Sequence, residues 1–283
     1  MAFRIPIIIN NPSYFNIIPN IIIKHLNLNF GCIPHDDEKT GIKKADVDFS
    51  QSSLIKTASI VGDIDLKRYF RPISNQYNLG SCVANGVADT AEAMFAKQFN
   101  INPSSVPDFS RLFIYYNARN NTTPPTADKD NGTYISIAMD SISRYGITNE
   151  SIWPYDTSKV FTRPSVLAYR TALQNRFFNY YSINSSGDQR IADIVKALSN
   201  GCPVVFGTKV DAAFTVSSGA ALVGPPSKNF VGGHCMVVVG KSGNNFVIRN
   251  SWGTEWRNSG YVMFTPEYLK ADITHDIWVL VRK

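Results

Sequence analysis

The fold is decided by the stretch Gln76-Tyr77-Asn78-Leu79-Gly80-Ser81-Cys82 and by the helix that follows it. Beyond Ser81, apolar residues recur every three to four positions, at Val83, Val87, Ala91 and Met94/Phe95. This period predicts an amphipathic helix, and Ser81 is a suitable N-cap residue. Cys82 would then lie in the first turn, where unpaired N–H groups and the helix dipole favour a thiolate. Cys82 is therefore a candidate nucleophile, although taken alone such a cysteine is more often a small core residue.

The rest of the chain separates into a helical part and a β-rich part. Further helices are predicted at about 134–145, closed by Gly146, and at about 189–199, closed by Gly201. Runs rich in β-forming residues follow at Pro203–Thr208, Cys235–Val239, Asn245–Arg249, Gly260–Phe264 and Ile277–Val281. This order indicates an α+β protein of two lobes, and the seam between two lobes commonly forms a cleft.

A nucleophilic thiol needs an imidazole beside it, and the chain has four histidines. His234 is the strongest candidate, because Gly232-Gly233 before it permits close approach of another backbone and the strand after it would hold it rigidly. The other three lie in the N-terminal region or near the C-terminus: His25, His35 and His275. Taken alone, His234 could equally be a core histidine with satisfied hydrogen bonds.

Asn250, at the end of the run 245–249, could orient His234, because a neutral amide fixes the imidazole tautomer without cancelling its charge. Trp252 follows closely enough to cover that hydrogen bond and exclude water. Acyl transfer also requires donors aimed at a developing oxyanion. The Cys82 backbone N–H and the Gln76 side-chain amide could supply them.

Composition excludes several classes of protein. The 283 residues are 44% hydrophobic and 12% aromatic, enough for one large domain or two lobes. No apolar run reaches 18 residues and no cleavable signal is visible, so we expect neither a membrane span nor secretion. The net charge of +6 is dispersed, which argues against nucleic-acid binding. The four cysteines lack CxxC spacing, so we expect no metal site and a reducing compartment such as the cytoplasm.

These motifs together resemble those of papain-like cysteine peptidases. The matching stretches are Gln76 with Gly80-Ser81-Cys82, Gly233-His234, Asn250-Ser251-Trp252-Gly253 and the following Gly260-Tyr261. Their order agrees, with the histidine 152 and the asparagine 168 residues after the cysteine (234 − 82 and 250 − 82). The resemblance implies a two-lobed fold, with a helical lobe, a β-barrel-like lobe and an active-site cleft between them.

Other residues resemble the family's substrate-binding segment or depart from its pattern. Gly132 and Thr133 stand where the family has a glycine pair that binds extended peptide, and Thr133 would narrow that edge. Leu79 and Asp130 replace a cysteine pair that many members join as a disulfide, which agrees with a reducing environment. Val83 replaces a usual aromatic residue, so packing beneath the nucleophile should differ.

The resemblance implies a monomeric peptidase that hydrolyses peptide or protein substrates through a thioester and needs no cofactor. A catalytically silent papain-fold module that binds peptides or proteins remains the alternative from another class, and acyl transfer to an acceptor other than water is a second enzymatic reading. Asp276 could lie at the bottom of the side-chain pocket and favour basic residues, or it could be an exposed carboxylate at a strand start. Cys202 and Cys235 are expected to be structural.

Residues 1–58 differ in composition from the rest, because Ile and Asn dominate to position 29 and an acidic-then-basic segment follows. We expect an N-terminal extension over 1–58 and a peptidase domain over 59–283. Within that domain we expect a helical lobe at about 75–185 and a β lobe at about 186–283 plus 59–74. Phe30-Gly31-Cys32-Ile33-Pro34-His35-Asp36 resembles a segment that precedes the peptidase domain in some bacterial and viral papain-like proteins. The extension could be a disordered tail, a non-native remnant or a zymogen pro-segment that borders the cleft and brings Cys32 near Cys82.

Overall fold

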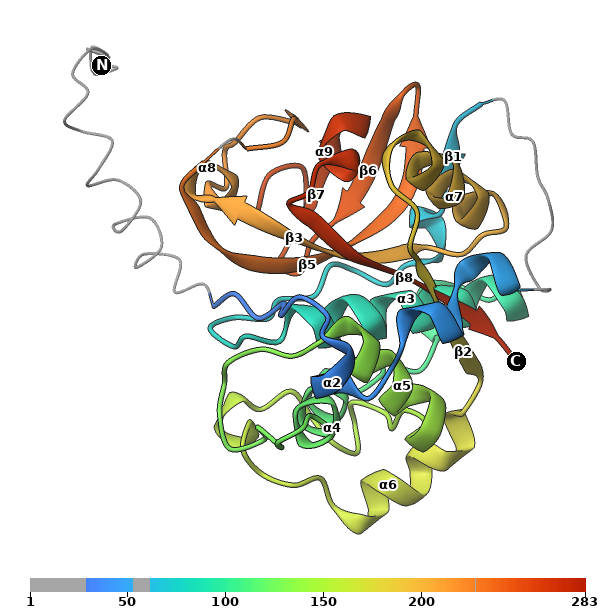
Figure 1. Cartoon of the computed structure of the whole chain (residues 1–283). Helices are drawn as coiled ribbons and strands as arrows, with labels where there is room; N and C mark the ends of the chain where they lie inside the picture. Colours follow the sequence, from blue (N-terminus) through green and yellow to red (C-terminus); the bar gives the residue numbers. More distant parts are fainter. Residues whose placement is uncertain (1–28, 53–61, 227) are drawn as a thin grey trace, which may run out of the picture.

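The computed structural model describes residues 29–52, 62–226 and 228–283 and contains a helical lobe and a sheet lobe (Figure 1). Its α-helices are α2 (Asp37–Thr40), α3 (Cys82–Phe99), α4 (Arg111–Asn120), α5 (Ile135–Tyr145), α6 (Val166–Ala172), α7 (Gly187–Ser199), α8 (Ala212–Thr215) and α9 (Pro266–Lys270). Its strands are β1 (Ile64–Asp65), β2 (Phe178–Ile183), β3 (Val204–Asp211), β4 (Leu222–Val223), β5 (Phe230–Ser242), β6 (Asn245–Arg249), β7 (Tyr261–Phe264) and β8 (Thr274–Arg282). Across the described ranges, none of the helices has both the length and the hydropathy needed to cross a membrane.

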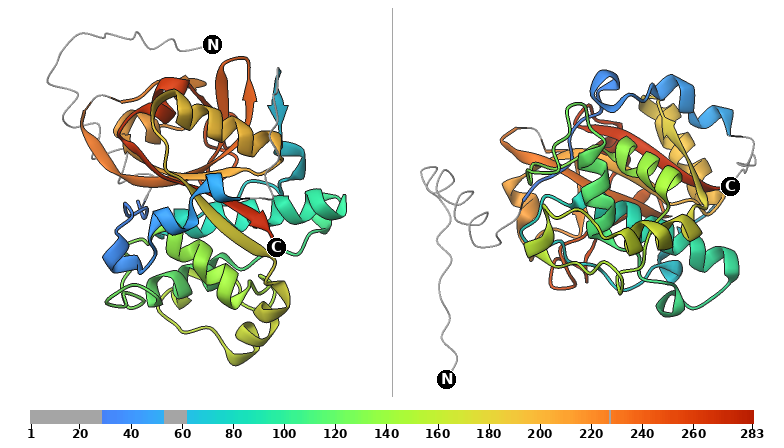
Figure 2. Two further views of the ribbon diagram at one scale, coloured as in Figure 1. Left: turned by 45° about the vertical axis from the view of Figure 1, so that its right-hand side comes forward. Right: turned by 90° about the horizontal axis from the view of Figure 1, so that it is seen from below.

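The sheet has the order β2-β8-β3-β5-β6-β7-β4, and β1 pairs with β5. All pairs are antiparallel except β4 with β7. Figure 2 shows the sheet lobe from two further directions, with β8 reaching toward the helical lobe. These elements confirm the predicted α+β fold class. The proposed division at residue 58 and between the lobes stays a prediction, since residues 1–28 and 53–61 lie outside the described part.

The predicted helices and β runs are all present, with longer strands than the sequence indicated for β3, β5 and β8. Helices α4 and α6 and strand β2 were not predicted from the sequence. Strand β2 lies within the range expected for the helical lobe, yet it pairs with β8 along its whole length. The two lobes are therefore joined by a strand that crosses from one to the other (Figure 1).

Helix α3 lies between the sheet and the helices α4, α5 and α6 (Figure 1). Its residues from Cys82 to Ala93 are all buried, so this stretch is covered by protein on every face. Gly86 faces β5, since a Cβ there would lie 3.4 Å from the sulfur of Cys235. Ser81 is the N-cap residue, but its hydroxyl makes no capping bond and instead contacts the Tyr155 hydroxyl at 2.5 Å. The expected capping role of the Ser81 side chain was therefore wrong.

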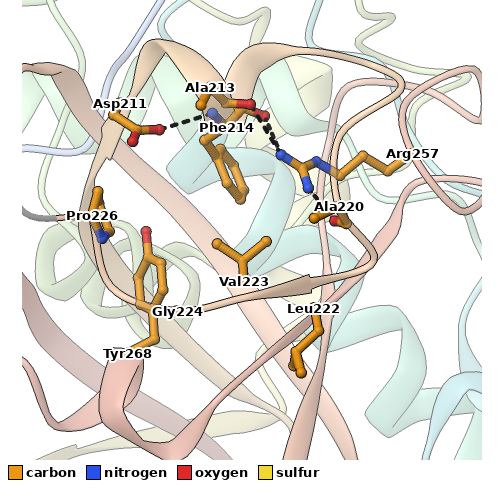
Figure 3. Close-up of a pocket in the computed structure, with 10 residues that line it drawn as sticks. All are labelled: Asp211, Ala213, Phe214, Ala220, Leu222, Val223, Gly224, Pro226, Arg257 and Tyr268. Carbon is orange, nitrogen blue, oxygen red and sulfur yellow. Dashed lines mark hydrogen bonds between the residues drawn. The ribbon is translucent and has the colours of Figure 1, made fainter.

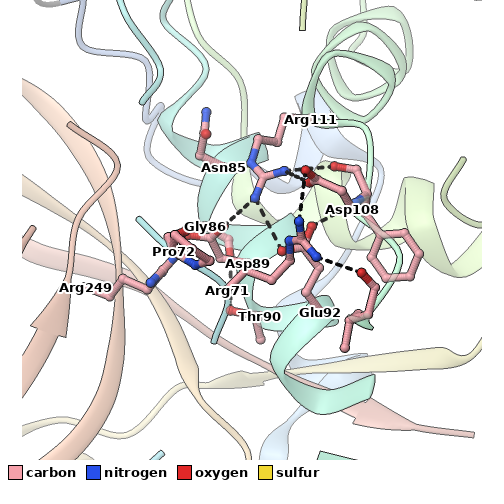
Figure 4. Close-up of polar contacts among 12 residues, drawn as sticks. Arg71, Pro72, Asn85, Gly86, Asp89, Thr90, Glu92, Asp108, Arg111 and Arg249 are labelled. Atoms are coloured by element: carbon pink, nitrogen blue, oxygen red, sulfur yellow. Dashed lines mark hydrogen bonds and ion pairs between the residues drawn. The ribbon is translucent and has the colours of Figure 1, made fainter. Parts of the chain in front are cut away.

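A buried network of charged groups ties α3 to α4 and to the end of β6 (Figure 4). The Asp89 carboxylate accepts hydrogen bonds from Arg111 and from Arg249, both at 2.7 Å. Burial would raise the pKa of Asp89, but the charges of these two guanidinium groups keep it below its usual value. Burial raises the pKa of the neighbouring Glu92 to about 8 despite the charge of Arg111. Arg249 immediately precedes Asn250, so the network fixes the end of β6 against α3.

Replacing Asp89 by alanine should destabilise the fold strongly. Arg111 and Arg249 would remain buried without their shared carboxylate, and breaking a buried pair in this way typically costs about 3–5 kcal/mol. Urea unfolding followed by tryptophan fluorescence measures this loss. Asp188→Ala is the control, because Asp188 is 94% exposed in its contact with Lys270 and should change stability by less than about 1 kcal/mol. Equal effects of the two substitutions would contradict the structural role of Asp89.

Candidate active site

The β5–β6 hairpin brings His234 and Asn250 together. Val237 pairs with Arg249, so the chain returns to the neighbourhood of His234 one residue later. The His234 Nε2 and Asn250 Oδ1 atoms are 2.7 Å apart, and both side chains are buried. If Nε2 carries the proton, Nδ1 is left as the basic nitrogen, and Nδ1 has no hydrogen-bond partner among the described residues. The Asn250 Oδ1 atom also accepts from the Ser251 backbone N–H at 2.8 Å, which fixes the amide orientation.

Trp252 covers this pair as the sequence predicted. Its ring stacks on the His234 imidazole with centroids 4.5 Å apart and planes inclined by 26°. Phe214 from α8 and Trp256 pack against Trp252 in turn, at 5.7 Å and 5.4 Å. The hydrogen bond between His234 and Asn250 is thus shielded from water by an aromatic cluster.

Cys82 occupies the first turn of α3 and is fully buried. Burial, with a smaller contribution from the nearby Cys32, raises the pKa of its thiol to about 12. The backbone N–H groups of Cys235, Gly31 and Val83 hydrogen-bond to its sulfur and lower the pKa in part. Because Cys235 follows His234 directly, this contact places the thiol beside the histidine segment. Burial also lowers the pKa of His234 to about 4, so at neutral pH the structure holds a thiol and a neutral imidazole.

The Gln76 side chain is buried and held at three points. Its Oε1 atom accepts from the Ser251 hydroxyl at 2.7 Å, and its Nε2 atom donates to the Leu79 carbonyl at 2.9 Å. The same Nε2 atom donates to the Asn29 carbonyl at 3.1 Å. Gln76 is therefore an oriented donor that faces a carbonyl of the N-terminal segment.

Residues 29–33 run between the sheet lobe and the helical lobe, as the blue segment in Figures 1 and 2 shows. The space that they fill between Gly233 and Thr133 is called the groove below. Cys32 forms a parallel bridge with Thr133, in which Thr133 N donates to Gly31 O at 2.8 Å and Ile33 N donates to Thr133 O at 3.0 Å. On the other side, Cys32 N donates to Gly233 O at 3.1 Å. The segment is therefore an extended strand held by the backbones of both lobes.

The fit of this strand is tight. A Cβ on Gly31 would overlap the Gly80 carbonyl, two residues before Cys82. Phe30 lies over His234 and Trp252, with ring centroids 6.2 Å and 6.3 Å apart in edge-on geometry. These contacts explain why Cys82 and His234 are buried.

The predicted substrate-binding residues all lie along this groove. Thr133 forms one edge with its backbone, and Gly132 precedes it where a Cβ would overlap Gly31. Asp276 is buried, with a side chain 2% exposed, so its alternative interpretation as an exposed carboxylate was wrong. Its oxygens accept from Lys44 Nζ and from His35 N, both at 2.6 Å. The Asp276 carboxylate, on β8, thus anchors the N-terminal segment through His35 and Lys44.

Several residues that build this site had no individual role predicted from the sequence, although Phe30 and Gly31 belong to the extension that could border the cleft. Asn29, Phe30 and Gly31 fill the groove, Lys44 binds Asp276, and Ser251 orients Gln76. The Phe-Gly-Cys stretch followed by charged residues was a visible signal for the first group. The pairing of Lys44 with Asp276, 232 residues apart, left no local signal in the sequence.

A separate pocket of about 240 Å³ lies behind the aromatic cluster (Figure 3). Phe214 lines it and also contacts Trp252, while Asp211, Arg257 and Tyr268 supply its polar groups. The Arg257 guanidinium is already engaged by backbone carbonyls of residues 213, 214 and 220. This pocket contains none of the predicted site residues.

Comparisons with known proteins identify the family of the chain. Residues 62–279 match the family described as papain family cysteine protease. An uncharacterized peptidase C1-like protein, L477, of Acanthamoeba polyphaga mimivirus is 31% identical over 276 residues, covering 90% of this chain and 87% of that protein. The crystal structure of xylellain, a cysteine protease from Xylella fastidiosa, has a TM-score of 0.70 at 26% identity and covers 90% of this chain and 96% of that one. Papain from Carica papaya is 22% identical over 214 residues, or 71% of this chain and 55% of that protein. The chain belongs to the papain family of cysteine peptidases.

Proposed function

We propose that Cys82, His234 and Asn250 form the catalytic triad of this peptidase and that Gln76 binds the oxyanion. The observation that carries the proposal is the 2.7 Å hydrogen bond from His234 Nε2 to Asn250 Oδ1. It leaves Nδ1 as the nitrogen able to exchange a proton with Cys82, whose sulfur accepts from the backbone N–H next to His234.

In this mechanism the Cys82 thiolate attacks the substrate carbonyl carbon, and the carbonyl oxygen becomes an oxyanion. The Gln76 Nε2 group and the Cys82 backbone N–H stabilise that charge. The position of Gln76 supports this role, because its amide already donates to a carbonyl oxygen, that of Asn29. The His234 imidazolium then protonates the leaving amine, and a water molecule attacks the thioester to release the acid and restore the thiol.

The extended substrate would occupy the groove now filled by residues 29–33. The backbones of Thr133 and Gly233 each offer hydrogen bonds to an extended chain, and they make such bonds to the N-terminal strand. Gly132 keeps that edge accessible, and Trp252 covers the histidine at the other end. Asp276 would favour a basic side chain once its bonds to Lys44 and His35 are released.

The N-terminal segment would act as an inhibitor of this apparatus. While it is seated, burial holds the pKa of Cys82 near 12 and that of His234 near 4, which disfavours the thiolate–imidazolium pair. Displacing the segment would admit water and shift both pKa values back toward the ion pair. Occupancy of the groove thus blocks the substrate and also suppresses the nucleophile.

Cys82→Ala should abolish peptide cleavage because it removes the nucleophile, and Gln76→Ala should lower the rate by about 10²–10³-fold through loss of one oxyanion donor. Both are measured as the initial rate on a fluorogenic peptide after removal of the N-terminal segment. Cys202→Ala is the matched control, since Cys202 lies in a separate pocket with Lys97, and it should retain full activity. Cleavage by clean Cys82→Ala protein would refute the assignment.

Gly31→Ala should expel the segment from the groove without altering any proposed catalytic residue. The added methyl group would overlap the Gly80 carbonyl, so the strand cannot remain seated. We expect faster alkylation of Cys82 by iodoacetamide at pH 7 than in the unchanged chain. Gly224→Ala is the control, because a Cβ there meets nothing within 4 Å and its backbone is not left-handed. An unchanged alkylation rate in Gly31→Ala would show that the segment does not shield the thiol.

Lys44→Ala should raise the pKa of Asp276 and weaken the anchor at low pH. Burial raises the pKa of this carboxyl, but the His275 hydrogen bond and the Lys44 charge lower it below its usual value. A depressed carboxyl pKa stabilises the folded state above the unfolded pKa of about 4, and this stabilisation is lost as pH falls through the folded pKa. Carbon-13 NMR titration of labelled aspartate measures the shift. Lys43→Ala, at an exposed neighbouring position, should leave the Asp276 titration unchanged.

A further inference from the structure

Three of the four cysteines converge on one place in the groove. Cys32 comes from the N-terminal strand, Cys82 from α3 and Cys235 from β5, and all are buried as free thiols. Cys202 lies apart from them, beside Lys97 and Arg282. The proposed peptidase mechanism uses only Cys82, so Cys32 and Cys235 need another explanation.

The sheet register places the Cys32 sulfur beside Cys235. Gly207 of β3 lies directly opposite Cys235 of β5. Side chains at directly opposite positions point to the same face of a sheet, with Cβ atoms about 4.5–5.5 Å apart. A Cβ on Gly207 would lie only 2.7 Å from the Cys32 sulfur. The Cys32 sulfur therefore occupies the space that a side chain at position 207 would fill, on the face shared with Cys235.

Two further contacts make this placement definite. The side chains of Cys32 and Cys235 interact directly, and this interaction with burial raises the pKa of the Cys32 thiol. The backbone of Cys32 is fixed on both sides, by Gly233 O at 3.1 Å and by the parallel bridge to Thr133. The Cys82 sulfur instead accepts backbone N–H groups, and Cys32 acts on Cys82 by charge alone. Cys235 is therefore the direct partner of Cys32.

Metal binding does not explain the cluster. Among residues 29–52, 62–226 and 228–283, no group of three or more histidine, cysteine or acidic side chains is arranged to hold an ion. Two adjacent thiols can instead be oxidised to a disulfide. Cys32 and Cys235 lie on different segments, which would separate if the N-terminal strand left the groove.

We propose that Cys32 and Cys235 are a redox pair whose disulfide locks the N-terminal strand in the groove. The proposal rests on the inhibitory role proposed for that strand. The bond would close a loop of 203 residues (235 − 32) and would make inhibition covalent without consuming Cys82. Reduction would restore the free thiols and permit the strand to leave.

Hydrogen peroxide supplies a balanced route to this bond. One thiolate attacks a peroxide oxygen, the O–O bond breaks, and a sulfenic acid and hydroxide form. The second thiolate attacks the sulfenic sulfur, forms the S–S bond and displaces hydroxide. With the two thiol protons, both hydroxides leave as water. The two sulfurs lose two electrons in total, and the peroxide gains them.

The experiment treats the full chain with one equivalent of hydrogen peroxide, blocks free thiols with N-ethylmaleimide and digests it without reduction. Mass spectrometry should find the peptides containing Cys32 and Cys235 joined. In parallel, the rate of Cys82 alkylation by iodoacetamide should fall at least about tenfold after oxidation, the scale expected of a native cross-link, and recover with dithiothreitol. Cys32→Ser should show neither the linkage nor the oxidation-dependent change, whereas Cys202→Ser should show both.

The linkage is identified by mass, so it is tested independently of peptidase activity. A Cys32–Cys82 linkage, or no linkage at all, would overturn the assignment even in an active peptidase. A Cys32–Cys235 linkage that leaves Cys82 alkylation unchanged would overturn the lock. Failure of the catalytic proposal would be distinct from both, since it would appear as peptide cleavage by Cys82→Ala protein.

Discussion

The carboxylate of Asp89 is the point on which the two halves of the site depend. It lies on α3, whose first residue is Cys82, and it binds Arg249, whose next residue is Asn250. One buried ion pair therefore sets the distance between the helix that carries the thiol and the strand end that orients the imidazole. Such a pair adds little net stability over apolar packing, but its geometry is strict because an unpaired charge in the interior is costly. The contribution of the Asp89–Arg249 pair is therefore to fix the position of α3 relative to the end of β6.

The same low-dielectric interior that fixes Asp89 also governs the chemistry of the groove. A thiolate and an imidazolium need water, or each other's charge, to be stable. Burial under residues 29–33 removes the water, and the raised pKa of Cys82 and lowered pKa of His234 are the consequence. The closed groove thus favours the neutral forms of both groups. Opening it would admit water and favour their charged forms again.

The sequence predicted elements and motifs formed by neighbouring residues, and it did not predict contacts between residues far apart in the chain. Periodicity identified α3, α5, α7 and five of the strands, and motif spacing identified Cys82, His234 and Asn250. It missed α4, since Arg111 and Arg119 are charged residues that the structure buries in ion pairs and backbone bonds. It also missed the Lys44–Asp276 anchor, because neither residue differs locally from a solvated charge. Pairing across 232 residues becomes visible only when the chain is folded.

If the N-terminal segment competes with a substrate for the groove, the balance between them depends on the contacts that they do not share. The segment and a substrate would both bond to the backbone groups of Thr133 and Gly233. A change in those bonds would alter the binding free energy of both equally, so the difference between them would stay the same. The strand has the advantage of attachment, which for a tethered ligand corresponds to an effective concentration in the millimolar range. It also has contacts of its own: Phe30 on Trp252, the Cys32 thiol over Gly207, and the bonds to Asp276 from His35 and Lys44. Under the proposed inhibition, release of the segment would depend on the Phe30 ring, the Cys32 thiol and the Asp276 carboxylate. Oxidation would act on the thiol and acidity on the carboxylate, without altering the backbone bonds that a substrate needs.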